Sequence, residues 1–287
     1  MGGDNAPDAI LAGSLAAVDL LSRDDAIVLI GDEAIIKEGM AEEGLADHPQ
    51  FEIESTTQVI EMGESPVTAL RSKPDSSIVR MSRLGSKRAG GKYCDIIISA
   101  GNTGACVAAA QMHLRRLPGV TRPGIAVTLP TFYGPIIIID VGANPEPKPH
   151  HLHQYAHMGT VYGRRIVGID QPRVAVLSIG GEEGKGSALT VDAAKRIKAD
   201  GKLNYVGHVE GRDLFDNKAD VVITEGFTGN VVLKLAEGLA AGLFKTIAHE
   251  IFEIDPQLAM KFEPVVKTIY AKHDYHEYGG APLMGAN

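Results

Sequence analysis

The sequence has few of the features that mark secreted, membrane-spanning or nucleic-acid-binding proteins. It contains only two cysteines, no CxxC pair and no signal-peptide pattern, which predicts a protein of the reducing cytoplasm. No run of about 18 uncharged apolar residues is present that would cross a membrane as a helix. A formal net charge of −8 argues against a general nucleic-acid binder, whose affinity depends on lysine and arginine contacts to phosphates.

The sequence also lacks the common motifs of nucleophilic and nucleotide-binding enzymes. No Gly-x-Ser-x-Gly elbow occurs, and neither Cys94 nor Cys106 lies in a motif that marks a nucleophile, so covalent catalysis is not expected. Residues 178–187 read S-I-G-G-E-E-G-K-G-S and precede a helical pattern, where a helix N-terminus offers free N–H groups to an anion. The glycine spacing differs from a nucleotide P-loop, and Gly186 rather than serine or threonine follows Lys185. This loop therefore predicts a site for a single phosphate.

The hydrophobic pattern predicts one α/β domain over residues 1–287. The chain is 44% hydrophobic and 22% charged, which is ordinary for a globular protein of this length. Most of its short apolar runs are continuous, as in parallel strands buried on both faces, and helical patterns lie between them. We therefore expect a three-layer αβα fold with a mainly parallel sheet, as a single domain with or without two lobes. The expected strands are 27–30, 51–53, 95–98, 125–129, 136–141, 174–179, 204–209 and 221–224.

Polar, glycine-rich segments follow several of the expected strands, and ligand sites in such sheets lie at the carboxyl ends of the strands. Residues 99–104 and 224–230 each place a hydroxyl and an amide at the start of a helix. They indicate either an anion site or ordinary helix capping. Asp140 follows four isoleucines and is either a functional acid or an acceptor that organises its loop. Together with Lys185, these segments predict a cleft for an anionic substrate.

Three further features have both functional and structural interpretations. His153 and His157 have the spacing of zinc ligands, with His150 and His151 nearby, but the sequence places no carboxylate or third ligand beside them, so no metal is expected. Residues 231–252 form an amphipathic helix whose apolar face predicts burial in the core or in a dimer, with membrane contact as the alternative. A basic stretch indicates a solvated helix face or a docking surface for an acidic protein, and it contains Arg80, Arg83, Lys87 and Arg88.

Seven motifs follow one another along the whole chain. They are M-G-G-D-N-A-P (1–7), S-A-G-N-T-G-A (99–105), D-V-G-A-N (140–144), E-E-G-K-G (182–186), E-G-R-D (210–213), G-F-T-G-N (226–230) and Y-G-G-A-P-L (278–283). In this order they resemble the PlsX-type phosphate acyltransferases. The resemblance implies a bacterial enzyme that converts acyl-acyl carrier protein and inorganic phosphate into acyl phosphate and free carrier protein, for phospholipid synthesis. It also implies a fold similar to phosphotransacetylases and isocitrate-type dehydrogenases, a homodimer, peripheral membrane contact in some members and no organic cofactor.

With this resemblance, roles can be assigned to the strand-end segments. We expect Lys185 to neutralise phosphate, Asp140 to orient Lys185 or accept a phosphate proton, and Asn230 to hold the thioester carbonyl. Asn144 is the alternative for the last role. The expected substrate-binding residues, of which Asn102 and Thr103 position phosphate, are Gly3, Asp4, Asn5, Asn102, Thr103, Gly104, Asn144, Gly184, Thr228 and Gly229.

The sequence departs from the family pattern at its ends and at one site position. Family members usually begin with a strand before the first motif and continue beyond Asn287, so we expect this sequence to be truncated at both termini. Glu225 stands where an aspartate is more usual. Two other functions stay open: a phosphotransacetylase that uses acyl-CoA, and a non-catalytic scaffold that binds carrier protein or membrane. A comparison of acyl-CoA with acyl-acyl carrier protein as donor would distinguish the phosphotransacetylase, and docking of a partner without turnover would identify the scaffold.

Overall fold

The structure is a computed structural model that describes residues 2, 3, 5–87, 91, 93–273 and 280–287. The chain divides into two compact units, which we call unit 1 (Met1–Leu117 with Ala286–Asn287) and unit 2 (Pro118–Gly285). Each unit has its own hydrophobic core, and each is described by itself. The expected single domain over residues 1–287 stays a prediction.

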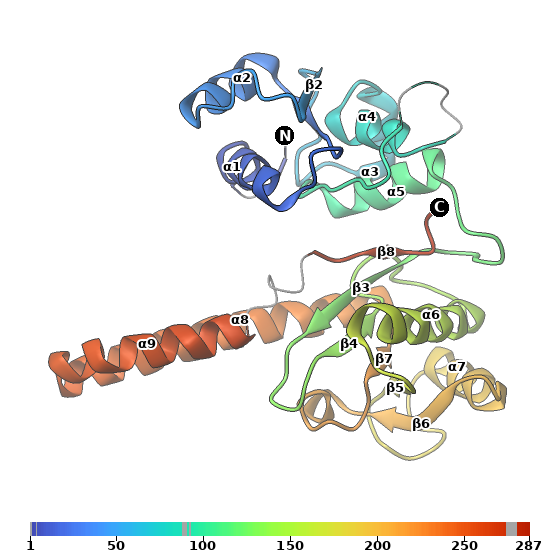
Figure 1. Cartoon of the computed structure of the whole chain (residues 1–287). Coiled ribbons are helices and arrows are strands. Elements are labelled where there is room, and N and C mark those ends of the chain that lie inside the picture. The colour runs from blue at the N-terminus through green and yellow to red at the C-terminus, as the bar shows by residue number, and fades with distance from the viewer. Residues whose placement is uncertain (1, 4, 88–90, 92, 274–279) are drawn as a thin grey trace. The chain divides into compact units, whose positions relative to one another are not determined.

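Unit 1 consists of helices around a small parallel sheet (Figure 1). Strand β1 (Ile27–Gly31) pairs with β2 (Phe51–Ser55) along their full lengths. One core lies around Leu29 beside these strands, and a second lies around Ile78 among the later helices. The helices are α1 (Asp8–Ala16), η1 (Ala17–Leu20), α2 (Glu33–Glu42), α3 (Pro66–Ser72), α4 (Ser77–Leu84) and α5 (Thr103–His113).

Unit 2 is built on a six-stranded sheet in the order β6-β5-β7-β4-β3-β8. The first four strands in this order run parallel to one another, whereas β3 is antiparallel to both β4 and β8. The carboxyl ends of the parallel strands therefore share one edge of the sheet, and β3 begins at that same edge. The strands are β3 (Gly124–Leu129), β4 (Ile136–Ile139), β5 (Arg173–Leu177), β6 (Asn204–Val209), β7 (Val221–Ile223) and β8 (Leu283–Met284).

Helices cover the strands of unit 2 and explain their continuous apolar sequences. Helix α6 contacts β4 and β7, and α7 contacts β5 and β6. Every residue of β3, β4 and β7 is buried, which is why β4 consists of isoleucine alone. Figure 1 shows α8 and α9 extending away from this sheet. The helices are α6 (Pro149–Tyr162), η2 (Gly163–Val167), α7 (Ala188–Ala199), η3 (Gly211–Phe215), α8 (Gly226–Ile254) and α9 (Pro256–His273).

The α/β class with a mainly parallel sheet is confirmed, and one expected strand is corrected. Residues 95–98 form no strand, and Ile96 and Ile98 are 78% and 86% exposed. Strand propensity alone does not suffice there, because a strand also needs a neighbour for its backbone groups. The expected strands 125–129 and 136–141 form an antiparallel hairpin, since residues 130–135 are too few for a parallel crossover. In the described part of the chain, no helix combines the length and apolar character needed to cross a membrane.

Candidate active site

Asp140 lies directly after β4, and its carboxylate is buried and hydrogen-bonded on both oxygens. Oδ1 accepts hydrogen bonds from the backbone N–H groups of Ile125 (3.1 Å), Gly142 (3.1 Å) and Ala143 (2.9 Å). Oδ2 accepts from the backbone N–H of Asn144 at 2.8 Å and from its side-chain amide at 3.0 Å. Five donors thus hold one carboxylate, and this geometry supports the loop-organising interpretation of Asp140.

Asn144 extends this network to helix α6. Its Nδ2 also donates to the carbonyl of Pro123 at 2.6 Å and to Tyr155 Oη at 2.9 Å. Burial, together with the negative charge of Asp140, raises the pKa of Tyr155 well above its ordinary value, so the hydroxyl stays protonated. Because the Asn144 amide already serves these internal acceptors, it has no remaining hydrogen for a thioester carbonyl.

The start of α8 is capped by the protein itself. Glu225 accepts hydrogen bonds from the backbone N–H groups of Phe227 (2.6 Å) and Thr228 (2.8 Å), and also from the Thr228 hydroxyl. A carboxylate therefore occupies the helix N-terminus, where a bound anion would otherwise lie. In this structure Thr228 contacts Glu225, and its contact with substrate stays a prediction.

Close packing joins the start of α8 to the Asp140 loop. A Cβ atom added to Gly229 would lie 1.9 Å from the carbonyl oxygen of Asp140, so only glycine fits there. Gly226 also packs closely on the backbone of Asn144, whose carbonyl accepts the Gly226 N–H at 2.8 Å. Asn230 follows on the exposed side of α8. The Asp140 loop and the first turn of α8 therefore form one polar cluster, with the Asn230 side chain accessible.

Lys185 lies in the loop between β5 and α7 and pairs with a carboxylate of the same loop. Its Nζ is 2.9 Å from Glu182 Oε2, and the two side chains are 56% and 68% exposed. The hydrogen bond from Lys185 lowers the pKa of the Glu182 carboxyl. The second glutamate, Glu183, is ion-paired with Lys198 on α7. Both glutamates of the E-E-G-K-G motif (182–186) thus have cationic partners. Gly184, an expected phosphate contact, adopts a left-handed φ of +91° that glycine accommodates.

Arg122 is a candidate residue that the sequence analysis missed. It lies just before β3, which begins at the sheet edge where β4 ends because the two strands are antiparallel. Burial and the positive charges of His150 and Arg122 lower the pKa of His151 to about 4. The charge of Arg122 also works to lower the pKa of Tyr155, against the larger effect of burial. Arg122 is therefore an exposed cation within electrostatic range of the Asp140 network. Its only sequence signal is its place before an apolar strand.

In unit 1, Asn102 caps α5 and joins it to a neighbouring loop. Its Oδ1 accepts from the N–H of Ala105 at 3.0 Å. Its Nδ2 lies within 3.1–3.2 Å of three carbonyl oxygens, those of Glu61, Met62 and Glu64. The side chain is buried, so these contacts support the capping interpretation rather than a direct contact with phosphate.

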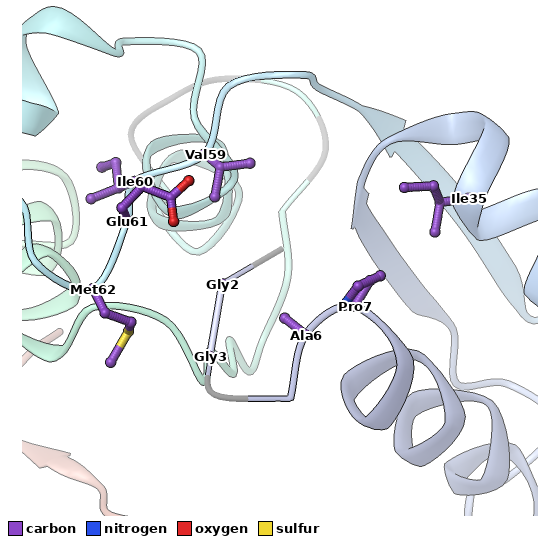
Figure 2. Close-up of a pocket in the computed structure, with 9 residues that line it drawn as sticks. All are labelled: Gly2, Gly3, Ala6, Pro7, Ile35, Val59, Ile60, Glu61 and Met62. Carbon is purple, nitrogen blue, oxygen red and sulfur yellow. The ribbon is translucent and has the colours of Figure 1, made fainter.

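A cavity of about 240 Å³ in unit 1 lies beside the loop that Asn102 holds. Gly3 has a φ of +112°, and a Cβ atom there would lie 3.0 Å from the carbonyl oxygen of Ala100, so Gly3 packs closely on Ala100. Among the described residues that line it, the cavity wall is mainly apolar and carries one carboxylate, that of Glu61, but no cation (Figure 2). It therefore does not suit phosphate by itself. The lining residues are Gly2, Gly3, Ala6, Pro7, Ile35, Val59, Ile60, Glu61 and Met62.

The structure gathers the expected site residues into two groups, one in each unit. Thr103 and Asn5 are exposed in unit 1, at the start of α5 and just before α1, and Gly104 packs against Pro66. Asp4 and Arg88 lie outside the described residues. Unit 1 holds Gly3, Asn5, Asn102, Thr103 and Gly104, and unit 2 holds Asp140, Asn144, Gly184, Lys185, Thr228, Gly229 and Asn230.

The expected basic docking stretch is partly neutralised within unit 1. Arg80 forms ion pairs with Asp75 and with Glu54 on β2. Lys87 lies with its Nζ 5.2 Å from the centre of the Tyr93 ring, and its side chain remains exposed. Arg83, on the same helix as Arg80, is also exposed. Among the described residues of the basic stretch, Arg83 and Lys87 are therefore the ones whose charged side chains are exposed to solvent.

Comparison with known proteins identifies relatives along the whole chain. The model of a family described as "Fatty acid synthesis protein" matches residues 1–287. The phosphate acyltransferase of Desulfitobacterium hafniense (strain DSM 10664 / DCB-2) is 43% identical over 290 residues, covering 100% of this chain and 84% of that protein. The phosphate acyltransferase of Heliobacterium modesticaldum is 42% identical over 289 residues, with the same two coverages.

Two solved structures share the fold at low sequence identity. A branched-chain phosphotransacylase from Enterococcus faecalis V583 has a TM-score of 0.52 and 13% identity, covering 81% of this chain and 80% of that one. A phosphotransacetylase from Streptococcus pyogenes has a TM-score of 0.51 and 14% identity, covering 82% and 87%. At these identities the likeness concerns the fold alone, and it agrees with the α/β class expected from the sequence.

Proposed function

The chain belongs to the phosphate acyltransferase family and transfers an acyl group to phosphate; we propose that the donor is a fatty acyl-acyl carrier protein and that the reaction takes place in the cytoplasm. A phosphate oxygen attacks the thioester carbonyl, the C–O bond forms, the C–S bond breaks, and the departing thiolate takes up a proton. Phosphate is already nucleophilic at neutral pH and a thiolate leaves readily, so the enzyme mainly has to position the reactants and stabilise charge. Burial raises the pKa of the Cys106 thiol, which agrees with direct attack by phosphate rather than by a cysteine.

The main support for the proposed phosphate-binding site is that three loops lie at the same edge of the unit 2 sheet. The loop of Lys185 follows β5, the first turn of α8 follows β7, and the Asp140 loop follows β4, and these three strands are parallel neighbours. Lys185 is the group proposed to bind phosphate, because its ion pair with Glu182 is exposed to solvent, which makes the pair weak and easily exchanged. Arg122, beside the start of β3 at this edge, is proposed as a second cation.

The remaining polar residues of this edge have supporting roles in the proposal. Asn230 is exposed on the first turn of α8, and its amide is proposed to hold the thioester carbonyl as negative charge develops on the oxygen. Asp140 and Asn144 are positioning residues, since their polar atoms are used to hold the loop. Asp140 therefore acts through loop geometry and not as the acceptor of a phosphate proton.

The acyl donor is proposed to dock on the exposed cations Arg83 and Lys87 of unit 1. Electrostatic docking of an acidic carrier protein affects encounter and KM more than the chemical step. Replacing both residues with glutamate should therefore raise KM for acyl-acyl carrier protein about tenfold or more and leave kcat nearly unchanged. Arg71→Glu, another exposed arginine of unit 1, is the matched control. An unchanged KM in the double variant would remove this surface from the proposal.

A second copy of this chain is proposed to cover the exposed face of α8. Leu235, Leu239 and Leu243 follow one another at four-residue spacing and are 67%, 67% and 57% exposed. Two-fold symmetry would set this apolar stripe against its own copy, which is the usual arrangement of homodimers. Leu239→Lys should convert a dimer to a monomer in light scattering after size exclusion. A monomeric wild-type protein that floats with anionic vesicles would instead assign the face to peripheral membrane contact.

The first experiment measures the release of free thiol from an acyl-acyl carrier protein, with and without inorganic phosphate. The proposal expects phosphate-dependent release with acyl phosphate as product, and slower release from acyl-CoA. Faster turnover of acyl-CoA would support the phosphotransacetylase alternative. Binding of the carrier protein without any release, by protein whose circular dichroism is that of a folded chain, would support the scaffold alternative.

A further inference from the structure

Two histidines on α6 and one aspartate after α7 converge in unit 2. His153 Nε2 and His157 Nε2 lie 2.8 Å and 2.7 Å from the same oxygen, Oδ2 of Asp200. The three ligand-type atoms lie within 4.8 Å of one another. The sequence shows the histidine pair but not the carboxylate, which is more than forty positions away and is brought to it by the packing of α6 against α7.

The surrounding backbone holds the aspartate in this orientation. Asp200 is the residue that follows α7, and its N–H donates to the carbonyl of Ile197 at 3.1 Å. Its carbonyl accepts from Leu203 N–H at 3.1 Å, and its Oδ1 accepts from Lys202 N–H at 3.0 Å. With Oδ1 fixed by the backbone, Oδ2 is directed to the histidines. Outer hydrogen bonds of this kind are what orient the ligands of metal sites.

The donor set fits a divalent transition metal. Two imidazole nitrogens and one carboxylate oxygen are the three protein ligands of many zinc sites that keep a fourth position for water. Four ligands at zinc bond lengths of about 2.0–2.2 Å are about 3.3 Å apart, so each N···O distance has to open by about half an ångström. The rings have room for this rotation, because His153 and His157 are 28% and 39% exposed and Asp200 is 20% exposed.

We propose that His153, His157 and Asp200 bind one divalent transition-metal ion, with Zn²⁺ as the best match, and leave one coordination position open to solvent. The site joins the middle of α6 to the end of α7. Helix α7 has 12 residues and is therefore about 18 Å long, which separates Asp200 from the loop of Lys185 at the other end of the helix. The metal therefore fastens two helices of unit 2 and does not act on the phosphate site.

The test is a zinc titration of chelator-treated, phosphate-free, untagged protein against a chromophoric competitor. Wild type and His249→Gln, a control at an exposed histidine of α8, should each bind one equivalent with the same affinity. His153→Gln, His157→Gln and Asp200→Asn should each weaken binding by more than about tenfold, the smallest loss expected even for an outer-shell change. Mg²⁺ should not compete, because it prefers an all-oxygen set.

Two further readouts separate metal binding from a structural effect. Co²⁺ in place of Zn²⁺ should give a visible absorption band in wild type and His249→Gln that is lost in the three variants. Zn²⁺ should raise Tm of the first two proteins only, because a ligand that binds the folded state stabilises it by mass action. Acyl transfer by His153→Gln should equal wild type. The proposal is overturned if wild type binds no equivalent, or if the doubly substituted protein His153→Gln/His157→Gln binds zinc as wild type does; the three groups would then form only a hydrogen-bonded cluster.

Discussion

Replacement of Asp140 by asparagine tests whether its buried carboxylate organises the edge of the unit 2 sheet. The substitution keeps the shape of the side chain but turns one acceptor oxygen into an NH₂ donor. In the less costly orientation the NH₂ group takes the place of Oδ2 and faces the two donors of Asn144. In the other orientation it would face three backbone N–H groups, those of Ile125, Gly142 and Ala143.

The expected loss of stability follows from the donors that lose their acceptor. The side-chain amide of Asn144 retains the Pro123 carbonyl and Tyr155 Oη as partners, so its backbone N–H is the donor left without one. A buried donor without a partner costs about 1–3 kcal/mol, and a lost charge-assisted bond adds about as much. Asp140→Asn should therefore lower the free energy of unfolding by about 2–6 kcal/mol. It should also lower kcat, because the loop that it holds packs against the first turn of α8.

The assay is urea unfolding followed by circular dichroism, with the change read from the midpoint at constant m-value. Asp192→Asn is the matched control, because its carboxylate is 58% exposed and its pair with Lys195 is 3.5 Å long. That control should change the free energy of unfolding by less than about 0.5 kcal/mol. A loss below about 1 kcal/mol for Asp140→Asn would refute the conclusion that five hydrogen bonds to this carboxylate hold the loop.

Three other substitutions give separate tests of the site and of the fold. Lys185→Ala should lower phosphate-dependent turnover by about 10²–10³-fold. The unfolding midpoint should change little, because the ion pair of Lys185 with Glu182 is exposed. Turnover within a few-fold of wild type would exclude Lys185 as the phosphate ligand. Gly229→Ala should lower Tm by several degrees because its Cβ would lie 1.9 Å from a backbone oxygen, whereas Gly238→Ala, with open space around it on the same helix, should raise Tm slightly. Burial raises the pKa of Asp220, but the hydrogen bonds from Arg173 outweigh burial, so the net pKa is lowered. The charged carboxylate therefore stabilises the fold fully at a pH above its unfolded-state pKa. This stabilisation is lost as the pH falls through the folded-state pKa. Asp220→Asn should therefore reduce the loss of Tm between about pH 5 and pH 3, and an unchanged acid profile would contradict this.

The parts of the fold that follow from local sequence were predicted well. Isoleucine at every position of 136–139 indicates a strand buried on both faces, and β4 is such a strand. The helical pattern expected after residue 187 is helix α7, and in the structure Ser187 Oγ caps its start by accepting from Thr190 N–H. Residues 95–98 show the limit of this reasoning, because whether an apolar run forms a strand depends on a pairing partner elsewhere in the chain.

The parts of the site that depend on long-range packing were not accessible from the sequence. Asp200 joins His153 and His157 only because α7 packs on α6, and no spacing rule connects residues so far apart. Arg122 was missed for a related reason, since its place beside the Asp140 loop follows from the antiparallel pairing of β3 and β4. Local patterns showed where loops begin, but the partners of each side chain are set by the register of the sheet.

The polar segments at the edge of the unit 2 sheet differ in the strength of the internal hydrogen bonds and ion pairs that a bound anion would have to displace. An anion entering the first turn of α8 would have to displace Glu225, whose oxygens accept three hydrogen bonds, and a charge-assisted hydrogen bond contributes about 1.5–3 kcal/mol. An anion approaching Lys185 displaces only one carboxylate, that of Glu182, and this ion pair is exposed to solvent and therefore weak. Under the proposed function, phosphate binding at Lys185 therefore displaces a weaker contact than binding at the start of α8 would, and this is consistent with the proposal that α8 presents Asn230 to the acyl group.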